Sequence, residues 1–202
     1  MVSDRDKKSI QNDLKFGEKN ECKIQPLLER KFKCKLKKTT DEFGVIDFSN
    51  DEEGVYIELK TRRNKHNCYK EGVRVGYNKI VKMSKMKHTK KKYVCFNCLD
   101  GVYVRKYHKK LLKYEKIKQK RMDRDGDGSW FILIKIENLR RIGNSLFENI
   151  ENADYIMPFG KYKNKRIGDI GYNTLKYYLD WSGLYEKCRV NLQKYIDSID
   201  RN

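Results

Sequence analysis

Apolar residues recur along the chain at spacings that change from helical to extended. Over residues 13–33 the spacing predicts a helix, whose apolar stripe consists of Ile24, Leu27, Leu28 and Phe32. Pro26 lies inside this helix and is expected to kink it, because proline has no amide hydrogen to donate. The polar residues 1–12 are expected to be frayed.

Extended runs follow this helix. Residues 43–48 and 55–60 predict two strands joined by a turn at 49–54. Residues 61–76 are expected to form a loop, and residues 77–86 a helix.

A second hairpin is predicted over residues 91–107, where two alternating runs flank an Asp100-Gly101 turn. After it come a basic stretch, an acidic turn and a nearly continuous apolar strand, at 109–121, 122–129 and 130–136.

The composition changes over residues 137–152, which predicts a connecting segment. We therefore expect two parts. Residues 1–150 form an α/β domain with a central mixed β-sheet flanked by helices, and residues 151–202 form a small helical C-terminal module.

The net charge of the chain limits the classes of partner that it is expected to bind. Lys and Arg number 47 and Asp and Glu 28, a formal net charge of +19 over 202 residues. Such an excess favours contact with a polyanion, above all nucleic acid. Compositional drift in an AT-rich genome, viral or cellular, is the alternative, although drift explains lysine in place of arginine better than so large a net excess.

The chain lacks the features of exported or membrane proteins. No apolar run approaches the ~20 residues of a membrane span, and the first residues lack the apolar stretch of a signal peptide. The six cysteines are scattered, so we expect reduced thiols and an intracellular location without membrane contact. No heptad or apolar helical face requires a homodimer.

Candidate chemistry lies in the first predicted hairpin. A turn of about six residues brings Asp47 level with Glu58 across the two strands. Lys60, two residues after Glu58, projects from the same face of its strand. Two close carboxylates favour a hard divalent cation between them, and a metal-bound water beside a lysine suits attack on a phosphodiester. The alternative is an exposed strand of alternating charge.

These residues resemble the PD-(D/E)xK nuclease superfamily, the restriction-endonuclease-like fold shared with Holliday-junction resolvases. The family pattern is a helix with a Glu, then an Asp, then (D/E)-x-K on adjacent strands. Asp47 and Glu58-Leu59-Lys60 match it, and Gly17-Glu18-Lys19-Asn20-Glu21 resembles the helix motif, with Glu21 preferred to Glu18. Ile46 stands where many members have Pro.

The resemblance implies a deoxyribonuclease that uses Mg²⁺ or Mn²⁺ and leaves a 5′-phosphate. Implied catalytic residues are Asp47, Glu58, Lys60 and Glu21, and implied metal ligands are Asp47, Glu58, Glu21 and Leu59. A helix after the E-x-K strand often presents a polar residue to the site, here Lys79. Arg62 and Arg63 are candidates for contact with phosphates. The alternative is that these three side chains are ordinary surface cations.

The C-terminal module contains a second resemblance. Residues 157–181, MPFGKYKNKRIGDIGYNTLKYYLDW, are similar to a small FGKYKGK…YLxW motif attached to some exonucleases, with Asn164 and Gly171 replacing its usual Gly and Pro. We expect its aromatic residues to face inward and its cations to face outward. The candidate nucleic-acid contacts are Lys161, Tyr162, Lys163, Lys165 and Arg166.

Two other motifs resemble metal-binding patterns but are incomplete. Cys95-x-x-Cys98 lacks a second pair for a zinc site. Asp123-x-Asp125-x-Asp127-Gly128 has Ile134 where a calcium loop requires Glu, so an acidic turn is favoured.

The sequence therefore predicts a metal-dependent nuclease acting on DNA in repair, recombination or replication. The alternatives are a non-catalytic nucleic-acid-binding or packaging protein, and a basic RNA-binding protein.

Overall fold

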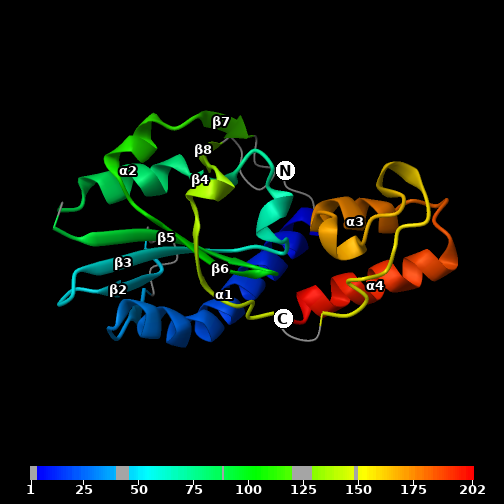
Figure 1. Ribbon diagram of the computed structural model, residues 1–202, viewed down its shortest axis with the longest axis horizontal. Helices are drawn as coiled ribbons and strands as arrows, with labels where there is room; N and C mark the ends of the chain where they lie inside the picture. Colours follow the sequence, from blue (N-terminus) through cyan, green and yellow to red (C-terminus); the bar gives the residue numbers. More distant parts are fainter. Residues whose placement is uncertain (1–3, 40–45, 88, 120–128, 148–149) are drawn as a thin grey trace.

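The chain folds as a mixed α/β protein (Figure 1). The computed structural model describes residues 4–39, 46–87, 89–119, 129–147 and 150–202. The α-helices within them are α1 (Asp4–Phe32), α2 (Tyr77–Lys85), α3 (Tyr172–Leu179) and α4 (Glu186–Asp200). The strands within them are β1 (Lys37–Lys38), β2 (Phe48–Asn50), β3 (Val55–Thr61), β4 (Val73–Gly76), β5 (Lys91–Cys98), β6 (Gly101–Lys106), β7 (Lys116–Gln119), β8 (Ser129–Ile134) and β9 (Arg140–Gly143).

Six of the strands form a mixed sheet in the order β1-β2-β3-β5-β6-β9. Strands β3 and β5 are parallel, and the other neighbours are antiparallel. A parallel pair requires a crossover connection, and here the crossover carries β4 and α2. Strand β4 joins a smaller sheet of order β4-β8-β7.

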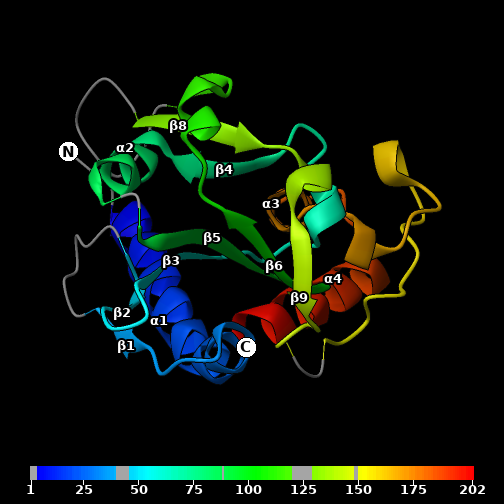
Figure 2. The same cartoon turned by 60° about the vertical axis from the view of Figure 1, so that its left-hand side comes forward.

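Helix α1 covers one face of the six-stranded sheet (Figure 2). Its stripe of Ile24, Leu27 and Leu28 packs on Phe48, Val55, Ile57 and Leu59 of the sheet. The helix ends at Phe32, after which Lys33 adopts a left-handed conformation with φ 55°. The apolar periodicity of α1 thus fixes which face of the helix meets the sheet.

The opposite face of the sheet carries α2 and the smaller sheet. Val94, Phe96 and Cys98 of β5 point into this second core, where they meet buried residues of α2 and of strands β4 and β8. Cys95, between them in sequence, points toward α1 instead. The central strands are therefore buried on both sides.

The C-terminal segment has a core of its own. Met157, Leu175, Leu192 and Tyr195 belong to an apolar cluster formed almost entirely by residues after 150. In Figure 1 its two helices stand beside the main body, at the right. Polar contacts join the two parts: Asn64 Oδ1 accepts a hydrogen bond from the amide of Tyr172 at 2.5 Å.

Several elements agree with the sequence prediction. The 91–107 hairpin is confirmed, although Leu99 and Asp100 form its loop and Gly101 pairs with Cys98. The strand expected at 130–136 is β8, and the helix expected at 77–86 is α2.

Other elements differ from it. Helix α1 begins at Asp4, so the stretch expected to be frayed is helical from that residue, and the helix continues through Pro26. Strands β4 and β9 lie within segments expected to be a loop and a connection. Both strands are stabilised by partners distant in sequence, β8 and β6, which local periodicity does not reveal. The acidic turn up to Gly128 and residues 43–45 lie outside the described residues.

Candidate active site

Asp47 and Glu58 lie level with each other. Phe48 pairs with Ile57, and the amide of Asp47 donates a hydrogen bond to the carbonyl of Ile57 at 3.0 Å, so the register continues to Asp47 and Glu58. Asp47 immediately precedes β2, whereas the sequence placed it at the end of a strand. Its side chain turns back to the β3 edge, where Oδ2 accepts a hydrogen bond from the amide of Leu59 at 2.5 Å.

Strand β3 alternates as predicted. Val55, Ile57 and Leu59 face the core under α1. Glu58 projects from the other face and has no exposed surface. Two lysines share its carboxylate: Lys60 Nζ contacts Oε1, and Lys79 Nζ lies 3.3 Å from Oε2. The E-x-K motif and the helix that follows it thus meet at one carboxylate.

The electrostatic balance at Glu58 is unfavourable to its charge. Burial raises the pKa of Glu58, and the neighbouring charge of Asp47 raises it further. Lys60 and Lys79 lower it, but the net direction is upward. An ionised Glu58 is therefore held at a cost in stability, which is common at functional sites.

A cavity of about 280 Å³ gathers residues from three elements. Glu21 comes from α1, Asp47 from the position just before β2, and Lys60 from β3. The remaining lining residues are Phe16, Gly17, Leu59, Thr61, Arg62 and Arg63. The space beside Gly17 on α1 is open, because a Cβ built there would meet no atom within 4 Å.

Of the two glutamates considered on α1, Glu21 lines the cavity. Its side chain is 23% exposed, whereas that of Glu18 is 74% exposed. Lys38 of β1 lies 3.1 Å from Glu21 Oε2. Burial raises the pKa of Glu21, and the charge of Asp47 adds to the rise while Lys38 opposes it. Asp47 thus repels Glu21 as well as Glu58, so the three carboxylates form one electrostatic group.

The donor set suits a hard divalent cation. Magnesium binds through one or two carboxylates and retains waters, and Glu21 and Asp47 supply two carboxylates on one cavity. Leu59 lines the same cavity, and its backbone amide donates the hydrogen bond to Asp47. Among the described residues no group of three or more His, Cys, Asp or Glu side chains is placed to hold a metal ion. Glu58 is engaged by the two lysines.

Arg62 and Arg63 both line the cavity but differ in their contacts. Arg62 donates a hydrogen bond to the carbonyl of Arg74 at 2.9 Å. The Arg63 guanidinium lies 3.8 Å from the ring centre of Phe16 and 2.8 Å from Asp200 Oδ1. Arg63 therefore fastens α4 to α1, a structural role.

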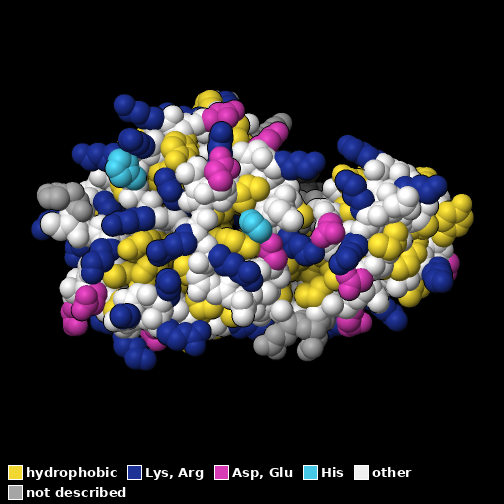
Figure 3. Space-filling model, in the orientation of Figure 1, with side chains coloured by type: hydrophobic (Ala, Val, Ile, Leu, Met, Phe, Trp, Pro, Cys, Tyr) yellow, Lys and Arg dark blue, Asp and Glu magenta, His cyan; other side chains and the backbone are white. Residues whose placement is uncertain are grey.

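The cations of the C-terminal module face outward as expected. Exposed side chains belong to Lys161, Lys163, Lys165 and Arg166, and Arg166 pairs with Asp154 at 3.0 Å. Tyr162 is half-buried against Tyr178. The expectation for the aromatics holds only in part, because Trp181 is 47% exposed. Figure 3 shows apolar side chains gathered at the right-hand end of the molecule.

The sequence did not identify several residues that line the cavity or contact its carboxylates. Lys38 lies in a short edge strand within a lysine-rich stretch, so nothing local distinguished it. Gly17 begins the helix motif of the resemblance and Phe16 precedes it, yet their position on the cavity depends on how α1 crosses the sheet. Cys95 and Cys98 lie in separate cores on the two faces of β5, and all six cysteines are free.

No helix among the described residues combines the length and apolar character that crossing a bilayer demands. Comparison of the chain with protein-family models, with curated proteins and with solved structures found no match.

Proposed function

We propose that the protein is a metal-dependent nuclease that hydrolyses phosphodiester bonds in DNA. The observation that carries the proposal is the meeting of Glu21, Asp47 and Lys60, from three separate elements, on one cavity. These are three of the four catalytic residues that the PD-(D/E)xK resemblance implies, and the fourth, Glu58, contacts Lys60. The net charge of +19 supplies the general attraction for a polyanionic substrate.

Asp47, Glu21 and the Leu59 backbone would hold Mg²⁺ or Mn²⁺. Glu58, the further ligand that the resemblance implies, contacts Lys60 and Lys79 and is not among the residues that line the cavity. A bound ion of this kind lowers the pKa of a coordinated water and stabilises charge on a phosphoryl oxygen. Lys60 contacts Glu58 and lines the cavity, where its ammonium would orient the attacking oxygen or offset charge on the phosphate. Lys79 balances Glu58 from the α2 side.

The test is cleavage of supercoiled plasmid with Mg²⁺ and with EDTA. We expect Asp47→Asn and Lys60→Met each to lower the rate by about 100-fold or more, the usual effect of removing one charge-stabilising group. The amide oxygen of the asparagine can still accept a hydrogen bond from the Leu59 amide, so the fold is retained. Lys187→Met, an exposed lysine of α4, is the matched control. Unchanged cleavage by either site variant, or cleavage in EDTA, would refute the proposal.

A non-catalytic nucleic-acid-binding protein is the second candidate. The two lysine contacts of the buried Glu58 favour it, because both of its oxygens already lie beside a cation without an ion. This candidate predicts DNA binding with no Mg²⁺-dependent cleavage in the same assay.

A further inference from the structure

A second, larger hollow adjoins the carboxylate cavity. It has a volume of about 1040 Å³ and shares Thr61, Arg62 and Arg63 with the cavity. One wall is the segment 61–74, which follows the E-x-K strand, and the other belongs to the C-terminal module between Tyr162 and Lys176. We call it the strand groove. A chain lying in it would reach the carboxylates through the shared residues.

The lining of the strand groove is basic. Its cations are Arg62, Arg63, Lys70, Arg74, Lys165 and Lys176, against the two carboxylates Glu71 and Asp169. Two of these cations, Arg63 and Lys176, are also paired with Asp200 of α4. Lys65 Nζ, 2.7 Å from Asp169 Oδ1, already balances one of the carboxylates. The excess of positive charge favours a phosphate backbone.

Aromatic rings share this lining. The partly exposed rings are those of Tyr69, Phe131 and Tyr162, while Tyr172 is buried and its hydroxyl bonds to Asp200. A basic groove with interspersed aromatic faces is the arrangement by which proteins bind single-stranded nucleic acid, since bases stack on the rings while cations follow the backbone. Paired bases inside a duplex do not offer their faces in this way.

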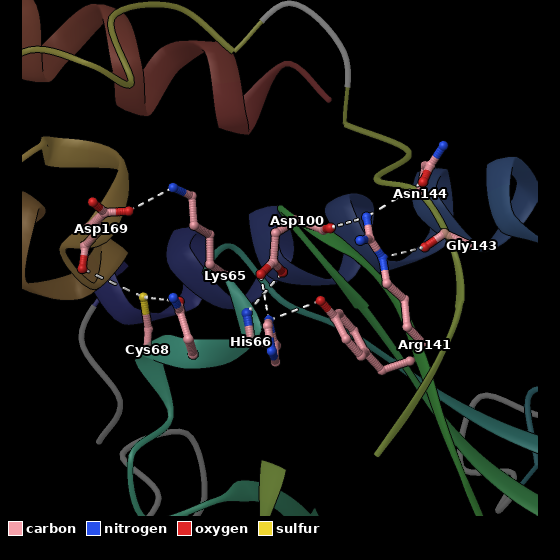
Figure 4. Close-up of polar contacts among 10 residues, drawn as sticks. Lys65, His66, Cys68, Asp100, Arg141, Gly143, Asn144 and Asp169 are labelled. Atoms are coloured by element: carbon pink, nitrogen blue, oxygen red, sulfur yellow. Dashed lines mark hydrogen bonds and ion pairs between the residues drawn. The ribbon is translucent and has the colours of Figure 1, made fainter. Parts of the chain in front are cut away.

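The walls of the strand groove are held in place by polar contacts. Figure 4 shows Lys65 reaching Asp169 of the C-terminal module, while His66 contacts Asp100 in the β5–β6 loop. The His66 amide donates to Asp100 Oδ1 at 2.9 Å, and Tyr103 stacks on the His66 ring with centroids 4.4 Å apart. The short helix η1 (His66–Cys68) is thus fixed from both sides, and the groove is formed before a ligand arrives.

We propose that the strand groove binds a single-stranded segment of DNA or RNA that adjoins the phosphate presented to the carboxylate cavity. The inference deepens the proposed function, on which its link to cleavage rests, by naming a substrate with an unpaired segment. A volume of about 1040 Å³ is close to that of pockets for single organic ligands, roughly 300–1000 Å³, so it accommodates a few unpaired nucleotides rather than a double helix.

Binding measured in EDTA tests the inference without cleavage. Fluorescence anisotropy would follow the full chain with a labelled thymidine oligonucleotide of about 12 residues, its uridine counterpart, and a hairpin duplex as competitor. The groove variant is Lys70→Glu with Lys165→Glu, and the control is Lys187→Glu with Lys194→Glu, which makes the same change in net charge on exposed sites of α4. Phe131→Leu removes one ring and keeps an apolar side chain.

We expect the groove variant to weaken single-strand binding about 10-fold more than the control, and to lower the slope of log K against log salt by about 1.4, or about 0.7 for each lost phosphate contact. Phe131→Leu should weaken binding about 5-fold without changing that slope. Equal losses in the groove and control variants, or equal competition by the duplex, would overturn the inference. Because no cleavage is involved, that result would leave the nuclease assay on Asp47 and Lys60 standing.

Discussion

The replacement Glu58→Gln separates what the site requires for function from what the fold requires for stability. Glu58 has no exposed surface, and its oxygens contact Lys60 and Lys79. Gln keeps the size of the side chain and removes its charge. The pKa of Glu58 is raised even with both lysines in place, so its negative charge costs free energy in the folded protein.

The sign follows from the pKa of Glu58, which burial, with help from Asp47, raises above the ordinary value of 4.5. A raised folded pKa means that the folded protein holds this proton more tightly than the unfolded chain does. The resulting stability is fully present below the unfolded pKa and is lost as pH rises through the folded pKa. At neutral pH the wild type therefore bears a penalty that the Glu58→Gln variant does not.

We expect Glu58→Gln to raise the free energy of unfolding at neutral pH by about 1 kcal/mol, typical for relief of a strained functional site, while abolishing cleavage. For a chain of this length that corresponds to a rise in Tm of about 2–4 °C. Thermal unfolding in EDTA between about pH 4 and pH 8 measures it, and the gain should grow with pH. Glu52→Gln, at an exposed turn residue, is the control and should change little. A variant less stable than wild type at neutral pH, or a pH-independent difference, would contradict the reasoning.

Three further outcomes follow from the cavity. Lys38→Met removes the cation paired with Glu21, so Mn²⁺ titration should give an affinity about 2- to 5-fold higher than wild type, and an equal or lower affinity would count against Lys38 as a competing charge. Gly17→Ala should raise Tm by about 2–4 °C in circular dichroism melts, because the site is helical and open; a lower Tm would mean that the cavity wall is tighter than described. Mn²⁺ at about 100 times its Kd should stabilise the wild type by about 2.7 kcal/mol and Asp47→Asn by much less, and equal stabilisation of both would place the ion elsewhere.

Local pattern was sufficient where an element and its partner are close in sequence. The alternation of Val55, Ile57 and Leu59 with Glu58 placed three side chains in the core and one on the other face, because side chains of a strand alternate by geometry. The turn between β2 and β3 is short, and Gly54 takes its required φ of 62°, so the pairing of Asp47 with Glu58 followed from counting residues.

Only the tertiary structure decided what depends on distant contacts. The position of Glu21 on the cavity requires α1 to cross the sheet, which the packing of its apolar stripe determines. The partner strands of β4 and β9 are distant in sequence, so the local spacing of apolar residues did not predict these two strands. The contact of Lys38 with Glu21 and the strand groove both form where segments distant in sequence come together. The burial of the three apolar cores brings these segments together, and no local sequence pattern specifies it.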